Sequence, residues 1–493
     1  MSLADEFKPD GRFFPWAILS LLALFQLLCV PGHYIGFEHD DIQYLLAARS
    51  LLEGSYSLGI FPGDPPLTVA SPGWPLLLMP AAFVSGEHPL GYQLWAWAWL
   101  VACDVLLWTL LRRRFSPILA AAGTALFALN PLVLSRAGVL MNEIPYLAFV
   151  LGGFVLFDRE RGVSGWIAGL LIGFSWLIRT ASLPFAAAVF AVFAFRKRWK
   201  DLGISVGLWA VAVIGWKVWS DWGGTGLAEH SELLATFGQE GIGSVVTVFA
   251  GNLKNAFQLL GGTLLPWRPH PGTPLLASLF GAVAWVAALG GLILRARDKG
   301  MDLPTAYLGF GILLHAVWPW WYERYLPPYL PVLVLGWAVL LERVPKSRGA
   351  IAALLLALGT VPGQGTVLVR REHLRYRPEM AVTYASIREH AAPDALFTSA
   401  FYCRDAYYSG RPFFPFPGGE GTLAQRMDAV GIGFLLWGGI PDLGSSLGDR
   451  FSSTRRLRAI ERELLGPDFK VFYHNKKENS TVFARVKSAK KSD

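Results

Sequence analysis

Charged residues are scarce in this sequence. They make up 16% of its 493 residues, whereas a soluble domain usually carries about 25%. Hydrophobic residues make up 53% of the chain, and the mean hydropathy is +0.40. This balance excludes an ordinary soluble domain and predicts an integral membrane protein.

Cysteine is scarcer still, with three residues. Cys29 and Cys103 lie in apolar runs and Cys403 lies in a polar tail, so their spacing indicates neither a metal site nor a disulfide framework. The net charge of +8 does not predict nucleic-acid binding, because the basic residues lie between apolar runs rather than on one face of a polar fold. An internal repeat is not evident either, which argues against a transporter built from paired halves.

Long apolar runs are what the sequence does contain. A helix needs roughly 20 mostly apolar residues to cross a bilayer, and about eleven runs approach or reach this length. They cover residues 14–30, 91–111, 116–135, 143–157, 165–180, 181–195, 202–220, 273–294, 303–320, 325–341 and 350–367. The first run lacks a cleavage site and a clean basic flank, so we expect a retained span. The sequence predicts a mostly α-helical, polytopic transmembrane bundle.

The turns between these runs differ in basic charge, which predicts an orientation by the positive-inside rule. With the N-terminus in the cytoplasm, the cytoplasmic turns carry Arg112, Arg113, Arg114, Arg159, Arg161, Arg196, Lys197, Arg198, Lys200, Arg295, Arg297, Lys299, Arg343, Lys346 and Arg348. The opposite side carries Arg49, Arg136, Arg179, Lys254, Arg268 and Arg324. Two long loops, near 31–90 and 221–272, then face outward. We expect a multi-pass protein of the inner (cytoplasmic) membrane of the cell envelope.

The last part of the chain has a different composition. Residues 1–367 are expected to form the transmembrane domain, and residues 368–493 a small soluble α/β domain on the extracytoplasmic side. Patterns typical of helices and strands occur in the tail, with helices at 379–390 and 456–465 and strands at 395–401, 431–437 and 470–487.

An acidic pair, Asp40 and Asp41, follows the first span and begins a short amphipathic pattern typical of a surface helix. Glu38 and His39 stand directly before it. A purely structural alternative is that Asp40 caps the helix, with Gln43 completing a capping box. Adjacent carboxylates can also bind a cation or take a proton from an acceptor hydroxyl.

Other charged residues are expected on the same outward side. Glu143 begins the fourth span, where the alternative is a favourable contact with the helix dipole. Arg179 lies near the outer end of the fifth span and could instead snorkel to the interface. Arg268 lies in the second outer loop, and Arg324 follows a cluster of aromatic residues beside Glu323. Arginines suit a phosphate, so one face carrying both charges suits transfer from a phospholipid-like donor.

Several of these residues stand in motifs that resemble a known superfamily. Asp40-Asp41-Ile42-Gln43-Tyr44 resembles the acidic-pair-x-x-Tyr motif of the GT-C membrane glycosyltransferases, in particular bacterial relatives of protein O-mannosyltransferases and lipid A aminoarabinose transferases. Further similar motifs follow in the same order: Ser71-Pro72-Gly73-Trp74-Pro75, Asn142-Glu143-Ile144-Pro145, Leu177-Ile178-Arg179 and Glu323-Arg324-Tyr325-Leu326-Pro327. The resemblance covers roughly residues 14–367.

The resemblance implies an inverting transfer of a hexosyl or pentosyl group from a polyprenyl-phosphate donor to a lipid, glycan or protein acceptor. It implies that Asp40 is the catalytic carboxylate, while Asp41 stands where many members have Glu. The remaining expected site residues are Glu143 and His39 as a second acidic site near the acceptor, and Arg179, Arg268 and Arg324 as ligands of the donor phosphate. The acidic pair permits a divalent cation but does not demand one.

Two alternatives to an enzyme remain at this stage. A transporter or lipid flippase for an anionic or glycolipid substrate would place ionisable residues within the spans, and Asp104, Lys217 and His315 are the candidates. A noncatalytic assembly protein would instead use the tail 368–493 to recruit partners and would not need Asp40 and Asp41.

Overall fold

The computed structural model describes residues 13–32, 34–36, 38–86, 88–158, 163–222, 242–264, 274–317, 323–344, 367–368, 380–438 and 453–486. The chain divides into two compact units. The first, here called the helical unit, comprises Met1–Pro31 and Thr68–His373. The second, the α/β unit, comprises Gly32–Leu67 and Leu374–Asp493. The acidic pair therefore belongs to the same unit as the C-terminal tail, which the sequence patterns did not indicate.

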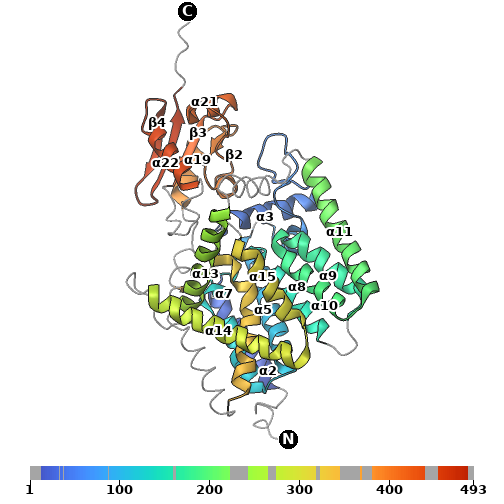
Figure 1. The fold of residues 1–493 in the computed structure, drawn as a ribbon. Helices are drawn as coiled ribbons and strands as arrows, with labels where there is room; N and C mark the ends of the chain where they lie inside the picture. Colours follow the sequence, from blue (N-terminus) through green and yellow to red (C-terminus); the bar gives the residue numbers. More distant parts are fainter. Residues whose placement is uncertain are drawn as a thin grey trace, which may run out of the picture. The chain divides into compact units, whose positions relative to one another are not determined.

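The helical unit consists of packed helices and short 3₁₀ turns (Figure 1). Its described elements are α2 (Phe13–Leu28), α4 (Gly73–Ser85), α5 (Pro89–Arg112), α6 (Pro117–Ala128), α7 (Pro131–Leu134), α8 (Glu143–Phe157), α9 (Gly165–Ile178), η1 (Thr180–Ser182), α10 (Leu183–Phe195), α11 (Trp199–Trp222), α13 (Ile242–Leu264), α14 (Pro274–Lys299), α15 (Leu303–Val317), η2 (Glu323–Tyr325), η3 (Pro327–Tyr329) and α16 (Leu330–Glu342). Each predicted span up to residue 341 coincides with helices in this set. The predicted span 350–367 lies almost wholly outside the described residues.

Three of the described helices are long and apolar enough by themselves to cross a membrane: α5, α11 and Ser278–Asp298 within α14. Shorter apolar helices account for the other predicted spans. Several of these spans consist of two pieces. Asn130 separates α6 from α7, and its side chain accepts the Leu132 N–H at 3.0 Å. Pro131 then occupies the first position of α7, where a missing N–H costs nothing.

Two helices lie in segments expected to be outer loops. Helix α4 follows the Ser71–Pro75 turn and is apolar, in agreement with a chain that re-enters the helical bundle. Helix α13 has an apolar stripe along one side and packs against α14 and α15. The approach of α13 to α14 depends on Gly281, because a Cβ there would lie 1.8 Å from the Phe257 carbonyl oxygen. An amphipathic helix escapes a search for continuous apolar runs, which is why the sequence patterns missed α13.

The α/β unit has helices on both faces of one five-stranded sheet, in agreement with the fold expected for the tail (Figure 1). Its elements are α3 (His39–Leu52), α19 (Ala381–His390), β1 (Phe397–Thr398), α20 (Tyr402–Ser409), β2 (Phe413–Phe414), α21 (Leu423–Ala429), β3 (Phe434–Trp437), α22 (Ser453–Leu464), β4 (Phe469–Asn475) and β5 (Ser480–Arg485). The strand order is β2-β1-β3-β5-β4. Strand β1 runs parallel to β2 and β3, whereas β5 runs antiparallel to β3 and β4.

Alternation along β3 divides the core of this unit between the two faces of the sheet. Leu436 packs with Tyr384 and Ile387 of α19. Its neighbour Leu435 packs on the other side with Met427 of α21 and with α22. Successive side chains of a strand point to opposite faces, so one strand anchors both helical layers. Helix α3 packs against α20, which joins the acidic segment to this core.

Candidate active site

The acidic pair lies in the first turn of α3. The helix begins at His39, and its N-cap is Glu38, whose side chain makes no capping bond. Asp40 is therefore inside the helix, and the capping-box interpretation is wrong for it. Gln43, the other proposed member of the box, instead donates from Nε2 to the Tyr402 hydroxyl at 3.2 Å. The side chain of His39 lies outside the described part of the chain.

Asp41 is a buried carboxylate, with 1% of its surface exposed. Its Oδ2 accepts the Gly36 N–H at 2.9 Å, and its Oδ1 accepts the Ile42 N–H at 2.9 Å. Burial, with a smaller contribution from the charges of Glu38 and Asp40, raises the pKa of Asp41 to about 7, although both backbone bonds oppose the rise. Asp41 can therefore gain or lose a proton near neutral pH.

Asp40 is half-buried and is the more accessible member of the pair. Tyr402 and Cys403, at the start of α20, lie close to it. Burial is the main reason that the pKa values of both groups are raised, and the Asp40 charge adds to the effect. Asp40 is thus placed beside polar groups of the tail domain while remaining open to a substrate.

Glu143, in the helical unit, is a buried carboxylate held by arginine. It begins α8 and is fully buried. Arg179 Nη1 donates to Glu143 Oε1 at 2.6 Å and to Asn142 Oδ1 at 2.7 Å. Asn142 Nδ2 in turn donates to the Ile178 carbonyl at 3.0 Å, so the start of α8 is tied to the end of α9. Charged pairs of this kind offset the cost of burying each charge alone.

Two further arginines surround Glu143, so positive charge is in excess there. Arg324 Nε lies 3.8 Å from Glu143 Oε1, and its side chain is 25% exposed. Arg136 lies near enough to act on the same carboxylate. The ring of Tyr325 completes the cluster, with the guanidinium carbons of Arg179 and Arg324 at 5.4 Å and 5.9 Å from its centroid. An excess of guanidinium groups suits an anion such as phosphate.

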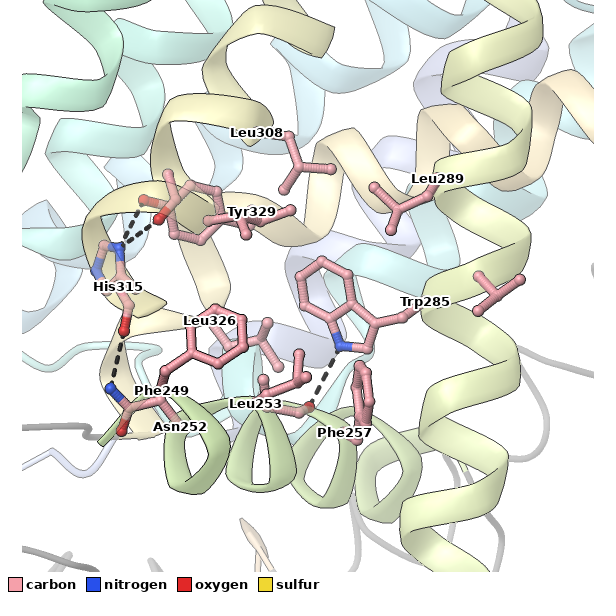
Figure 2. A pocket seen from close by; sticks show the side chains of 14 residues that line it. Phe249, Asn252, Leu253, Phe257, Trp285, Leu289, Leu308, His315, Leu326 and Tyr329 are labelled. Atoms are coloured by element: carbon pink, nitrogen blue, oxygen red, sulfur yellow. Dashed lines mark hydrogen bonds between the residues drawn. The ribbon is translucent and has the colours of Figure 1, made fainter. Parts of the chain in front are cut away.

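An apolar pocket of about 170 Å³ lies between α13, α14 and α15 (Figure 2). Most of its wall is aliphatic or aromatic, and it includes Phe249, Leu253, Phe257, Trp285, Leu289 and Leu308. Polar groups gather at one end, where the Tyr329 hydroxyl lies 3.2 Å from His315 Nδ1 and Asn252 Nδ2 donates to the His315 carbonyl at 2.9 Å (Figure 2). The His315 ring lies 5.2 Å from that of Tyr325. Tyr325 therefore links the polar end of the pocket to the arginine cluster.

The structure brings together Glu143, Arg179 and Arg324 from the predicted site residues. It also adds Asn142 and Tyr325, whose only sequence signal was their position inside the two motifs. Arg268 lies outside the described residues. Among the side chains that the structure describes, no group of three or more His, Cys, Asp or Glu residues could hold a metal ion.

Comparison with solved structures reveals the same fold. ArnT from Cupriavidus metallidurans bound to undecaprenyl phosphate aligns with a TM-score of 0.60 and 13% identity, over 96% of this chain and 98% of that chain. The apo form of the same protein gives 0.58 and 13%, over 97% and 99%. The oligosaccharyltransferase of Archaeoglobus fulgidus, in complex with zinc and sulfate, gives 0.53 and 13%, over 85% and 67%. These likenesses confirm the predicted polytopic membrane fold with a small α/β domain.

Sequence comparisons complete the identification. A search of curated proteins finds no match. The model of glycosyltransferase family 87, however, matches residues 70–319, which is more than half of the chain. Together with the solved structures, this match confirms the GT-C resemblance that the motifs indicated. The chain is a multi-pass membrane protein and belongs to glycosyltransferase family 87.

Proposed function

We propose that this protein transfers a hexose or pentose from a polyprenyl-phosphate donor to an acceptor hydroxyl at the outer face of the cytoplasmic membrane, with inversion at the anomeric carbon. The observation that carries the proposal is the contact between the arginine cluster and the apolar pocket through Tyr325. A polyprenyl phosphate has the same division, with an anionic head and an apolar tail. ArnT from Cupriavidus metallidurans binds undecaprenyl phosphate, which supports this donor class.

Arg324 is the best phosphate ligand among the described arginines. It is a quarter exposed and lies 3.8 Å from Glu143, so it can turn toward a ligand. Arg179 already donates to Glu143 and Asn142 and is better suited to maintain the positive field. The contacts of Glu143 favour orienting Arg179 over binding the acceptor. Arg268 keeps its proposed role as a third phosphate ligand.

The proposed reaction is a single displacement. Asp40 takes the proton of the acceptor hydroxyl as the oxygen attacks the anomeric carbon of the sugar. The bond from that carbon to the phosphate oxygen breaks, and the polyprenyl phosphate leaves with the electron pair. The arginines stabilise the charge that develops on the leaving phosphate. The buried charge of Asp41 beside Asp40 favours uptake of the proton by the pair.

The proposed orientation has the N-terminus in the cytoplasm and both the acidic pair and the tail domain outside. Its support is the uneven distribution of Arg and Lys between alternate turns. A cysteine-accessibility assay on intact cells tests it, with single cysteines placed at Asp394 and at Arg196. Labelling at position 394 and protection at position 196 are expected, and the reverse pattern would contradict the orientation.

The function is tested by incubating membranes with a radiolabelled polyprenyl-phosphate sugar and following label into new products. Asp40→Asn is expected to slow transfer by about 100-fold or more, the usual contribution of a general base. Asp394→Asn is the matched control, because Asp394 is an exposed carboxylate of the same unit. Equal transfer by Asp40→Asn and wild type would overturn the role of Asp40. Absence of transfer by wild type with every polyprenyl-phosphate sugar would overturn the function.

The transporter alternative is not favoured by the contacts of its candidate residues. Lys217 pairs with Asp221 at 2.7 Å on an exposed part of α11. His315 contributes to the polar end of the pocket. Membership in a glycosyltransferase family also favours an enzyme. Movement of a lipid-linked sugar into vesicles without covalent transfer would reverse this preference.

A further inference from the structure

We propose that the tail domain is part of the active site, because the hydroxyl of Tyr408 in α20 positions the loop that holds Asp41. Tyr408 is thus a positioning residue that acts through the backbone of Ile35 and Gly36. The inference rests on the proposed function, in which the Asp40–Asp41 pair performs the acid–base step.

Tyr408 bonds both backbone groups of one residue in the acidic loop. Its hydroxyl accepts the Ile35 N–H at 2.8 Å and donates to the Ile35 carbonyl at 2.7 Å. Ile35 is itself 1% exposed, so water cannot easily replace the bonds. Loss of the hydroxyl would leave two buried backbone groups unsatisfied. One side chain of the tail therefore determines the path of the chain directly before Gly36.

The ring of Tyr408 is held in a stack of tyrosines. It lies parallel to Tyr34, with centroids 5.9 Å apart, and close to parallel to Tyr384, with centroids 5.6 Å apart. Tyr384 donates its hydroxyl to Asp405 Oδ1 at 2.7 Å, and Ser399 donates to Asp405 Oδ2 at 2.6 Å. These contacts anchor the ring in the core of the α/β unit, so the hydroxyl has little freedom to move.

Gly36 is the link between this anchor and the carboxylate. Its N–H donates to Asp41 Oδ2, and its carbonyl accepts the Tyr34 hydroxyl at 3.1 Å. It has a φ of +113°, and a Cβ at this position would lie 2.8 Å from Cγ of Arg404. Arg404 of α20 thus packs directly on the loop. The tail contacts the loop at Ile35 and at Gly36, and the loop donates to Asp41.

The positioning has a signature in the pH dependence. The Gly36 N–H bond lowers the pKa of Asp41 and so opposes the effect of burial. The other charged or titratable groups around this carboxylate are Glu38 and Asp40 on its own segment, and Tyr408 and Arg404 on α20. If Tyr408 no longer holds the loop, the Gly36 bond weakens and the pKa of Asp41 rises further. The acidic limb of the rate profile then moves to higher pH.

The test is Tyr408→Phe in the full-length protein, since this change removes the hydroxyl and keeps the ring stack. We expect kcat for sugar transfer to fall about tenfold, with KM for the donor within about twofold. The acidic limb should move up by about half a pH unit or more. Hydrogen exchange at the Ile35 and Gly36 amides should become about tenfold faster. Tyr473→Phe is the control, because it removes a hydroxyl from β4 of the same unit.

The outcomes separate this inference from the proposed function. If wild type transfers sugar and Tyr408→Phe matches Tyr473→Phe in kcat and pH profile, the positioning role is wrong and the function stands. A fall in kcat without any shift of the acidic limb or of the local amide exchange also contradicts positioning, because it indicates a general loss of folded protein. If wild type transfers no sugar, the proposed function fails first, and the inference that rests on it fails with it.

Discussion

Each unit of this protein buries a carboxylate, and the two are stabilised in different ways. Glu143 in the helical unit is fully buried and receives a guanidinium N–H at 2.6 Å, with a second guanidinium at 3.8 Å. Asp41 in the α/β unit is just as buried but receives backbone N–H groups at 2.9 Å, and the charged groups that act on it are the carboxylates of Glu38 and Asp40. One carboxylate is balanced by positive charge, while the other is surrounded by dipoles and like charge.

The difference separates a fixed charge from a titratable one. A carboxylate bound to arginine stays ionised and can orient its partners. A carboxylate buried among dipoles and other carboxylates has its pKa raised toward neutrality, as Asp41 does. In the proposed mechanism the first kind suits the site that binds the donor phosphate, and the second suits the site that exchanges a proton.

The largest expected effect comes from breaking the ion pair. Arg179→Met leaves Glu143 without its closest cation and should lower the free energy of unfolding by about 3–5 kcal/mol. The double variant Glu143→Gln/Arg179→Met removes both charges and should recover much of the loss. Thermal unfolding of the purified protein in detergent measures both. If the single and double variants are equally unstable, the pair is not what stabilises this region.

A smaller effect is expected where the backbone holds the carboxylate. Gly36→Ala adds a Cβ that meets Arg404 and must adopt a φ of +113°, so a loss of about 2 kcal/mol is expected. Gly54→Ala is the matched control, because Gly54 has a φ of +85° with open space around the added Cβ. Thermal unfolding should show the larger loss for Gly36→Ala. Equal losses would mean that the contact with Arg404 does not constrain the loop.

Removing the charge of Asp41 should stabilise the protein in a pH-dependent way. The pKa of Asp41 in the folded chain is about 7, above its ordinary value of 3.8. Between these values the folded chain binds more protons than the unfolded chain, so the wild type loses stability as the pH rises. The advantage of Asp41→Asn over wild type should therefore grow by about 2 kcal/mol from pH 5 to pH 8. Unfolding curves at both pH values check this, and an advantage that does not change with pH would refute a titrating Asp41.

The smallest effect on stability is expected at the edge of the arginine cluster. Arg324→Gln should cost less than about 1 kcal/mol, because this side chain is a quarter exposed and 3.8 Å from Glu143. In the same variant the KM for a polyprenyl-phosphate donor should rise about tenfold, since one charge-assisted contact to phosphate is lost. Unfolding and transfer kinetics of one preparation give both values. A stability loss as large as that of Arg179→Met would show that Arg324 is structural.

Much of the helical unit was predictable because its signal is local. An apolar run of sufficient length specifies a helix whatever lies elsewhere in the chain, and the predicted spans agree with α2, α5, α8 and α11 in particular. Helix α13 was missed because its apolar residues are spaced around the helix rather than consecutive. The strands of the tail were found from alternation, whereas the short strand β2 has too few residues for any pattern.

The sequence by itself determined the membrane character of the chain, its helices and the order of motifs that resemble the GT-C enzymes, because each of these is written in neighbouring residues. Only the tertiary structure decided that Arg179 lies on Glu143 and that Tyr408 lies on Ile35, 373 residues away along the chain. A hydrogen bond between distant residues depends on how whole elements pack, and no local pattern encodes that geometry. The acidic pair was visible from the start, but its support from the tail domain was not.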